Sequence, residues 1–317
     1  MTGISGLLGT NLANTLLADG FNLKAIIRDP SKYQGLRTPN LELIRMDLGG
    51  DYEPHLKGVQ TVVHLAAETA TDLVDCQPYY EINTEATIRL FDISKKLSVN
   101  QFIFISTANT IGHGSRQELG KEGHPMRKPF SQLCYAQSKR KAEEYLVNQM
   151  NGMEVKILNP TFMIGPHDIK PSSGKIIQLA LGKKVVFYPP GGKNFVPVKD
   201  VVRAIINSFQ HGTSGQKYLV AGANLTYAEF FSRLRAISGD KQVLIPAPKA
   251  LLLLIGIFGD LIRSLSIKTS ISYVNMNILC VNNFYGNEKS KSDLQVQYTP
   301  LDEAIEEAVE YFRNDSL

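Results

Sequence analysis

The stretch Thr2-Gly3-Ile4-Ser5-Gly6-Leu7-Leu8-Gly9 opens the chain and runs directly into an apolar segment, residues 8–19, that is predicted to be helical. Glycine tolerates positive φ and lets a ligand approach the backbone closely, and this stretch has one at every third position. The N-terminus of the following helix then presents free N–H groups to an anion such as a pyrophosphate. The pattern therefore predicts a dinucleotide-binding loop, provided that strands and helices alternate after it.

The first half of the chain shows that alternation. Short β-type runs predict buried strands at 23–28, 41–45, 61–65, 101–106 and 154–158. Helical patterns lie between them at 8–19, 79–96 and 135–150. This order predicts an α/β fold, a Rossmann-like doubly wound parallel sheet with helices on both faces.

The texture changes after Pro160, where prolines and glycines divide the chain into loops and short elements. Helices are predicted at 198–209, 227–238 and 301–314. We expect residues 1–160 to form the dinucleotide-binding domain. Residues 161–317 should form mainly a smaller C-terminal substrate lobe, with some segments returning to the core.

The glycine loop has an unusual position, because only Met1 and Thr2 precede Gly3. Such a loop should follow a buried strand that is central in the usual order 3-2-1-4-5-6. We therefore expect the first β-strand to be missing, through truncation of the chain at its N-terminus. Its absence should be costly, because a central strand contributes ladder bonds on both edges.

Composition excludes several classes of protein. The chain has 317 residues, 43% hydrophobic and 20% charged, with a formal net charge of +4 and no basic block, so a nucleic-acid surface is not expected. The six histidines lack metal-ligand spacing, which predicts no metal. The cysteines, Cys76, Cys134 and Cys280, are too few and too far apart for a disulfide framework, which favours a reducing, cytoplasmic setting. Cys134 is expected to be a small buried thiol.

The longest apolar run, 250–259, is shorter than the roughly 20 residues that span a bilayer. We expect no membrane span, and we interpret the run as a packed helix of the C-terminal part rather than as an interfacial membrane helix.

The end of the second predicted strand bears on cofactor choice. An acidic residue there binds a ribose 2′-OH, whereas an arginine accommodates a 2′-phosphate. Arg28 stands first after the strand, and Lys32 can reach the same region. NADP(H) is therefore favoured, with NAD(H) as the alternative if Asp29 turns inward in place of Arg28.

A tyrosine and a lysine four residues apart occur twice, at Tyr135–Lys139 and at Tyr285–Lys289. On a helix such a pair shares one face, and the ammonium can lower the pKa of the phenol so that it exchanges protons near neutral pH. The second copy contains Gly286 and Asn287, which disfavour helix, so Tyr135–Lys139 is the expected functional pair.

With these features in place, the chain resembles the extended short-chain dehydrogenase/reductases of the NAD-dependent epimerase/dehydratase family, and is most similar to dihydroflavonol-4-reductase-like proteins. The resemblance covers nearly the whole chain. The matching stretches, in order, are Thr2–Gly9, Asp47-Leu48, His64-Leu65-Ala66-Ala67, Asn83, Ile105-Ser106-Thr107 through Gly112, Tyr135 with Lys139, Asn159-Pro160-Thr161 and Phe195–Val201.

The resemblance implies roles for particular residues. Tyr135 would donate a proton, Lys139 would lower its pKa and hold the nicotinamide ribose, and Thr107, preferred over Ser106, would polarise a carbonyl. Cofactor contacts would come from Gly3, Ser5, Gly6, Leu7, Leu8, Gly9, Arg28, Lys32, Asp47, Leu48, Leu65, Ala66, Ala67, Tyr135, Lys139, Pro160 and Thr161. Residues that could face a substrate are Glu68, Asn109, His167 and Phe195.

Three functions follow as alternatives. The favoured one is an NADP(H)-dependent oxidoreductase that reduces a ketone or aldehyde of a small molecule. The second is a nucleotide-sugar epimerase or dehydratase with tightly held NAD(P), and the third is a non-catalytic dinucleotide-binding protein. A homodimer through the helices that carry Tyr79 and Tyr135 is also implied.

Overall fold

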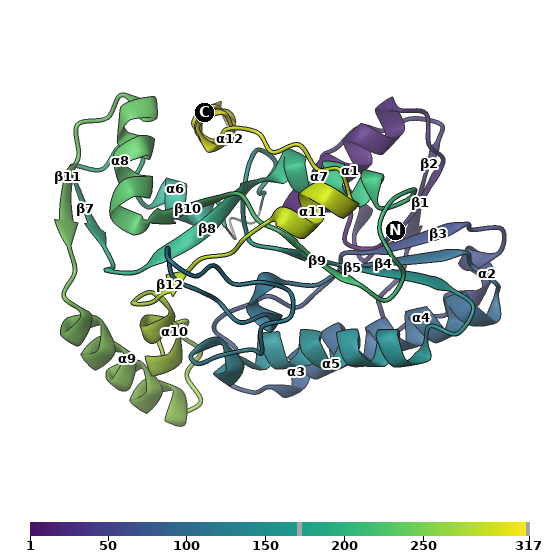
Figure 1. Ribbon diagram of the computed structural model, residues 1–317, viewed down its shortest axis with the longest axis horizontal. Helices are drawn as coiled ribbons and strands as arrows, with labels where there is room; N and C mark the ends of the chain where they lie inside the picture. The colour runs from purple at the N-terminus through teal and green to yellow at the C-terminus, as the bar shows by residue number, and fades with distance from the viewer. Residues whose placement is uncertain (170–172, 315–317) are drawn as a thin grey trace.

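A computed structural model describes residues 1–169 and 173–314, and its main feature is a parallel sheet with helices on both faces (Figure 1). The strands of this sheet are β1 (Leu23–Ile27), β2 (Leu41–Arg45), β3 (Thr61–His64), β4 (Gln101–Ile105), β5 (Glu154–Pro160) and β9 (Lys217–Val220). They run in the order β2-β1 and then β3-β4-β5-β9, with every pair parallel. The predicted doubly wound fold is confirmed.

Met1 and Thr2 lie between β1 and β3, where the sequence predicts that a central strand is missing. Thr2 forms parallel bridges to Ile26 of β1 and to His64 of β3. Its N–H donates to the Val63 carbonyl over 3.1 Å, and the Ile26 N–H donates to the Met1 carbonyl over 2.9 Å. The ladder at this place is one residue long, yet it joins the two groups of strands.

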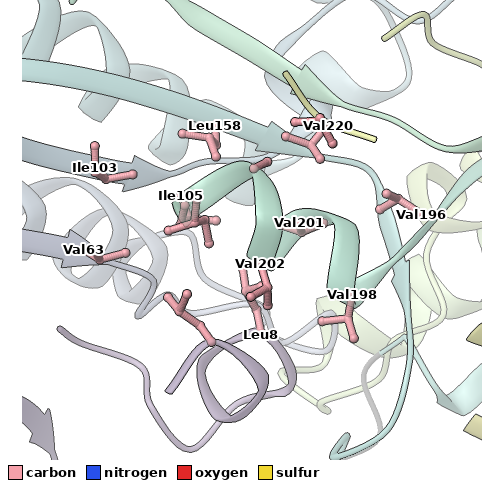
Figure 2. Packing of buried hydrophobic residues seen from close by; sticks show 14 of the residues in the cluster. Leu8, Val63, Ile103, Ile105, Leu158, Val196, Val198, Val201, Val202 and Val220 are labelled. Carbon is pink, nitrogen blue, oxygen red and sulfur yellow. The ribbon is translucent and has the colours of Figure 1, made fainter. Parts of the chain in front are cut away.

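Helices cover both faces of the sheet as expected. On one face lie α1 (Leu7–Ala18) and α7 (Val198–Asn207), and on the other lie α4 (Ala86–Lys96) and α5 (Cys134–Gln149) (Figure 1). Figure 2 shows Leu8 of α1 and Val202 of α7 packed against Val63, Ile105 and other sheet residues. This burial is the hydrophobic driving force that holds the glycine loop against the strand ends.

The helix predicted at 79–96 is divided into three parts. Gln77–Tyr80 form α3, Glu81–Glu85 form a π-helical turn, and α4 follows. The wider π turn redirects Asn83, whose side chain bonds backbone groups outside the helix. Sequence periodicity does not distinguish such a turn from a continuous α-helix.

The second lobe is built around β8 (Gly192–Pro197). Strands β6 (Phe162–Ile164) and β12 (Asn282–Asn283) pair with it in parallel, and β10 (Ala223–Thr226) pairs with it antiparallel. A separate pair joins β7 (Val185–Tyr188) to β11 (Val243–Pro246). The remaining elements are α2 (Glu53–Leu56), α6 (Lys175–Gln178), α8 (Tyr227–Ser238), α9 (Lys249–Ser264), α10 (Tyr273–Ile278), α11 (Glu288–Asp293), α12 (Leu301–Asn314) and the 3-10 turns Pro30–Lys32, Ala108–Thr110 and Phe130–Gln132.

One prediction for the second lobe is wrong. The run 250–259 is helical, within α9, but it is not a packed helix, because most of its large apolar side chains are exposed. Only Gly256 and Gly259 of α9 are buried. Apolar composition predicts burial only when another element is available to cover the helix, and the chain supplies too little. Among the described residues no helix combines the length and apolar character that crossing a bilayer demands.

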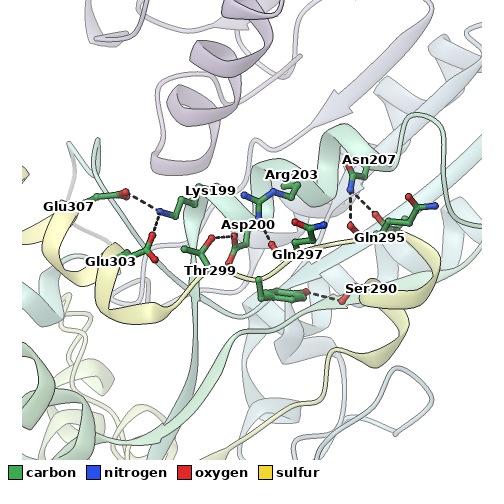
Figure 3. Close-up of polar contacts among 12 residues, drawn as sticks. Lys199, Asp200, Arg203, Asn207, Ser290, Gln295, Gln297, Thr299, Glu303 and Glu307 are labelled. Atoms are coloured by element: carbon green, nitrogen blue, oxygen red, sulfur yellow. Dashed lines mark hydrogen bonds and ion pairs between the residues drawn. The ribbon is translucent and has the colours of Figure 1, made fainter.

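A polar network ties the C-terminal segment to α7 (Figure 3). Asp200 is fully buried and accepts hydrogen bonds from the Thr299 N–H at 2.9 Å, the Thr299 hydroxyl at 2.8 Å and Arg203 at 2.8 Å. Lys199 forms exposed ion pairs with Glu303 and Glu307 nearby. Because α7 also packs on α1, this network links the second lobe to the helix that follows the glycine loop.

Asp200→Ala should destabilise the protein, because the variant leaves the Thr299 donors and Arg203 without their buried acceptor. We expect the free energy of unfolding to fall by about 3 kcal/mol, measured by urea denaturation. Glu303→Ala is the matched control, because it removes an exposed ion pair worth at most about 1 kcal/mol. Equal losses in the two variants would contradict the role given to Asp200.

Candidate active site

The glycine loop is shaped by close backbone contacts. Gly3 has φ of +75°, and a Cβ there would lie 2.7 Å from the Ala66 nitrogen. A Cβ on Gly9 would lie 2.0 Å from the Gly3 carbonyl oxygen. Two of the three glycines are therefore required by the protein's own packing.

Gly6 differs from the other two. It is the N-cap of α1, with φ of −90°, and a Cβ there would meet only the Gly3 oxygen at 3.7 Å, an ordinary contact. No side chain caps α1, and its first turn has no acidic residue. The positive end of the helix thus faces open space that a side chain could fill. Free N–H groups at such a helix end can bind an anion such as a pyrophosphate, and Ser5, Leu7 and Leu8 flank this position.

A buried hydrogen-bond chain fixes the loop to β3. The Ala66 N–H donates to the Thr2 hydroxyl over 3.1 Å, and the same hydroxyl lies 2.7 Å from His64 Nδ1. His64 Nε2 lies 2.9 Å from the Thr87 hydroxyl, which donates to the Asn83 carbonyl. Thr87 therefore accepts from Nε2–H, and His64 accepts the Thr2 proton at Nδ1. Burial lowers the pKa of His64 well below its usual value, which keeps the ring neutral.

Asn83 connects these hydrogen bonds to α5, the helix that carries Tyr135. Its side-chain oxygen accepts the Glu68 N–H over 2.7 Å, and its amide donates to the Glu68 carbonyl at 3.0 Å and the Ser138 hydroxyl at 3.1 Å. Ser138 in turn donates to the Tyr135 carbonyl over 2.9 Å. The predicted cofactor residues Leu65, Ala66 and Ala67 are partly exposed beside this network.

Thr107 and Ser106 point in different directions at the end of β4. The Thr107 hydroxyl lies near the Tyr135 phenol, whose pKa it lowers, and it accepts the Asn109 N–H over 3.2 Å. The Ser106 hydroxyl instead donates to Glu143. This placement favours Thr107 over Ser106 as the partner of Tyr135, as alternation along a strand predicts.

Tyr135 and Lys139 lie in the first two turns of α5, with altered pKa values. Burial raises the pKa of Tyr135 to about 12, and the nearby Thr107 hydroxyl opposes the shift. Burial lowers the pKa of Lys139 to about 7, and the nearby Glu143 carboxylate opposes that shift. Lys139 Nζ donates to the Ile105 carbonyl over 2.9 Å. The shift for Tyr135 is opposite to the expected lysine effect, because desolvation of the phenolate dominates.

Glu143 is a buried carboxylate near Lys139 that the motif comparison does not reveal. It is fully buried one turn after Lys139, and its carboxylate receives the Thr110 hydroxyl at 2.8 Å, the Asn159 amide at 2.7 Å and Lys217 Nζ at 2.5 Å. The sequence does contain a signal for this residue: Glu143 stands four residues after Lys139, a spacing that places both on one helix face.

Asn159 extends that network to the next predicted cofactor segment. Its amide also donates to the Thr107 carbonyl over 3.1 Å, which ties β5 to the end of β4. Pro160 is buried, and the Thr161 hydroxyl donates to Asn194 over 2.6 Å.

The residues after β1 and β2 lie at the same edge of the sheet. Arg28 is exposed directly after β1, while Asp29 accepts the Ser31 N–H at 3.1 Å and the Ser31 hydroxyl at 2.7 Å. Lys32 forms an ion pair with Asp29 at 3.7 Å. After β2, Asp47 is exposed and the Leu48 carbonyl accepts hydrogen bonds from Tyr52 and Arg89.

The four suggested substrate residues are placed differently from one another. Glu68 and Asn109 follow β3 and β4 and are partly exposed. His167 stacks obliquely on Tyr311, with ring centroids 5.5 Å apart. Phe195 is fully buried between Phe162 and Phe230, which leaves it no surface for a ligand.

The second tyrosine-lysine copy is structural. Tyr285 precedes α11, is buried, and donates to the Ala108 carbonyl over 2.9 Å. Lys289 donates to Gln216 at the surface over 2.8 Å. The two side chains are not on one helix face, which agrees with the choice of Tyr135–Lys139.

Cys76 and Cys134 form a disulfide, with Cα atoms 5.4 Å apart, and this corrects the expectation of separate thiols. The bond links the residue before α3 to the first residue of α5, directly before Tyr135. The 58-residue separation gave no sign of the pairing, which depends on how α3 packs on α5. Cys280 is a free thiol.

Comparison with known proteins agrees with this geometry. The sequence model of the NAD dependent epimerase/dehydratase family matches residues 1–221. A putative dihydroflavonol 4-reductase of Synechocystis is 26% identical over 99% of this chain and 94% of its own length. A UDP-glucose 4-epimerase of Vibrio cholerae is 30% identical over 76% of this chain and 75% of its own. The crystal structure of gox2253 superposes with a TM-score of 0.84 at 27% identity, over 99% of this chain and 97% of that one.

Gly6→Ala tests the cradle, because a methyl group fits the folded protein but occupies the space of a pyrophosphate. We expect an unchanged melting temperature and a loss of NADPH affinity of about tenfold or more, measured by fluorescence titration. Gly123→Ala is the control, since its Cβ would meet nothing within 4 Å and lies outside the loop. Native affinity in Gly6→Ala would exclude this loop as the binding site.

Proposed function

Because this chain belongs to the NAD-dependent epimerase/dehydratase family and is an NAD(P)-dependent oxidoreductase of the extended short-chain type, we propose that it reduces a ketone or aldehyde of a small molecule with NADPH. The observation that carries the proposal is the group at the ends of β4 and α5. There the Tyr135 phenol lies near the Thr107 hydroxyl, with a buried Lys139 one turn away.

The residues of the chain divide the chemistry among them. Bound nicotinamide supplies the hydride. Thr107 donates a hydrogen bond to the substrate carbonyl oxygen and stabilises the negative charge that develops there. Tyr135, with its pKa raised to about 12, carries its proton at neutral pH and donates it to that oxygen. Lys139 orients the ribose hydroxyls and supplies positive charge beneath the site.

The surroundings of Arg28 support NADP(H) over NAD(H). The Asp29 carboxylate is engaged by both donors of Ser31 and by Lys32, so it is not directed toward a ribose. Arg28 is exposed and follows β1 directly, where it can receive a 2′-phosphate.

Nucleotide-sugar epimerisation is the second candidate, favoured by the similarity to the UDP-glucose 4-epimerase. An epimerase returns the hydride to the same substrate and holds its cofactor tightly. Oxidised cofactor that copurifies with the protein, together with activity without added NADPH, would favour this function over external carbonyl reduction. We further propose a homodimer through the helices that carry Tyr79 and Tyr135, α3 with its continuation α4 and α5, which sedimentation equilibrium would test.

Tyr135→Phe removes the proton donor and keeps the ring. We expect NADPH-dependent carbonyl reduction to fall by about 10²-fold or more, measured from NADPH consumption. Tyr80→Phe is the matched control, because the exposed Tyr80 hydroxyl bonds only Gln137 among the described contacts. Full activity in Tyr135→Phe would remove Tyr135 from the mechanism.

Glu143→Gln tests the charge balance at Lys139. Glu143 raises the pKa of Lys139, so its neutralisation should move that pKa below about 7. The ammonium exists below its pKa and is lost as pH rises through it. Activity that requires the Lys139 ammonium should therefore be lost at a lower pH in the variant than in the native enzyme. The alkaline limb of the pH profile of kcat/KM should shift to lower pH.

The control for this measurement is Glu144→Gln, an exposed neighbour that pairs with Arg140. Its pH profile should match that of the native enzyme. An unshifted alkaline limb in Glu143→Gln, or a shift to higher pH, would contradict the coupling between Glu143 and Lys139.

A further inference from the structure

Exposed apolar side chains gather in one part of the chain. Among the described residues, sixteen of the nineteen large hydrophobic side chains that are exposed lie between Leu179 and Tyr273. Figure 1 places α9, β7 and β11 together at one end of the molecule, at the left of the view. We use the name α9 surface for the exposed apolar residues of α9 and the loop after it: Leu251, Leu254, Ile255, Ile257, Phe258, Leu261, Ile262, Leu265, Ile267 and Ile271.

The α9 helix is oriented with its apolar side chains outward. A Cβ on Gly256 would lie 2.7 Å from the Tyr273 Cα, and one on Gly259 would lie 2.3 Å from the Ile271 carbonyl oxygen. The two glycines therefore form the tight inner contact, while Phe258 is 66% exposed. Each exposed Leu, Ile or Phe leaves apolar area in contact with water, so a partner that covers this face would stabilise it.

Exposed lysines accompany the apolar face. Two of them, Lys249 and Lys268, belong to α9 and the loop after it. Lys183, Lys184 and Lys241 precede β7 and β11, the strands at the same end of the molecule (Figure 1). None of the five forms an ion pair with any described residue. The acidic residue within α9, Asp260, accepts the Tyr273 N–H over 3.1 Å. The charge that complements this surface is therefore negative.

We propose that the α9 surface docks on the face of an anionic phospholipid bilayer. A 16-residue helix is about 24 Å long, too short to span a bilayer, but it can lie in the interface with Leu, Ile and Phe among the acyl chains. The lysines would then contact anionic headgroups. A second copy of the chain fits less well, because a two-fold contact would bring the same unpaired lysines of both copies together.

The α9 surface is mechanically connected to the candidate active site. Arg263 donates to the Leu73 carbonyl, and Asn275 of α10 donates to the Thr71 carbonyl over 3.3 Å. Both acceptors belong to the loop after β3 that also carries Glu68. Docking would hold this loop beside the bilayer, where an apolar substrate would be concentrated. The docking itself does not depend on which reaction the site performs.

Vesicle flotation of the full-length protein tests the proposal. Native protein should float with phosphatidylcholine vesicles that contain phosphatidylglycerol and bind pure phosphatidylcholine vesicles more weakly. The triple variant Leu254→Ser, Phe258→Ser, Leu261→Ser should lose about tenfold or more of its affinity. Leu36→Ser changes an exposed leucine elsewhere and should bind like the native protein. Lys249→Gln with Lys268→Gln should weaken binding to the anionic vesicles only.

Several results would overturn the proposal. The first is that the native protein does not bind anionic vesicles, and the second is that the triple variant binds them as tightly as the native protein. The third is that the native protein binds no lipid but forms a dimer, and that the triple variant is monomeric. The last result would assign the face to a second copy, and binding that requires an acidic protein instead of lipid would assign it to a protein partner. Tyr135→Phe should bind vesicles like the native protein, so a failure of docking is distinguishable from a failure of the proposed reaction.

Discussion

The position of Thr2 between β1 and β3 is the constraint on which the rest of the structure depends. Its backbone supplies the single-residue ladder that joins the two groups of strands. Its hydroxyl receives the Ala66 N–H and pairs with His64, so the same residue fixes the glycine loop against the end of β3. Through Thr87 and Asn83 this series of hydrogen bonds continues to Ser138, near the start of α5. The cofactor cradle and the candidate catalytic tyrosine are therefore positioned by one continuous set of buried bonds.

A second buried group, the Glu143 carboxylate, raises the pKa of the neighbouring Lys139. It collects donors from Ser106, Thr110, Asn159 and Lys217, which come from three different strands or their ends. A buried carboxylate is stable only when it is paired and hydrogen-bonded, and this one is. It also keeps part of the positive charge on Lys139, whose burial alone would favour the neutral form.

Much of the fold follows from the sequence, because hydrophobic period and chain order determine a doubly wound sheet. The strand at 41–45 and the helices at 227–238 and 301–314 have the predicted bounds. Spacing also predicts that Tyr135 and Lys139 share one helix face, and both lie in the first two turns of α5.

Other features depend on contacts between distant segments, which local patterns do not contain. The π turn at Glu81–Glu85 forms around bonds from Asn83 to Glu68, and the Cys76–Cys134 bond depends on the packing of α3 against α5. The large side chains of α9 are exposed because the helix packs through Gly256 and Gly259, and no described element covers its opposite face. The pKa of Tyr135 moves opposite to the motif-based expectation, because burial of the phenol raises it.

We propose above all that the glycine loop and the residues after β1 hold NADP(H), with its 2′-phosphate, beside Tyr135. Parallel titration of the pure protein with NADPH and NADH, followed by cofactor fluorescence, tests it most directly. We predict saturable binding of both cofactors, with NADPH bound more tightly because Arg28 is exposed and the Asp29 carboxylate accepts the Ser31 hydroxyl. Tighter binding of NADH, or binding of neither cofactor, would contradict it.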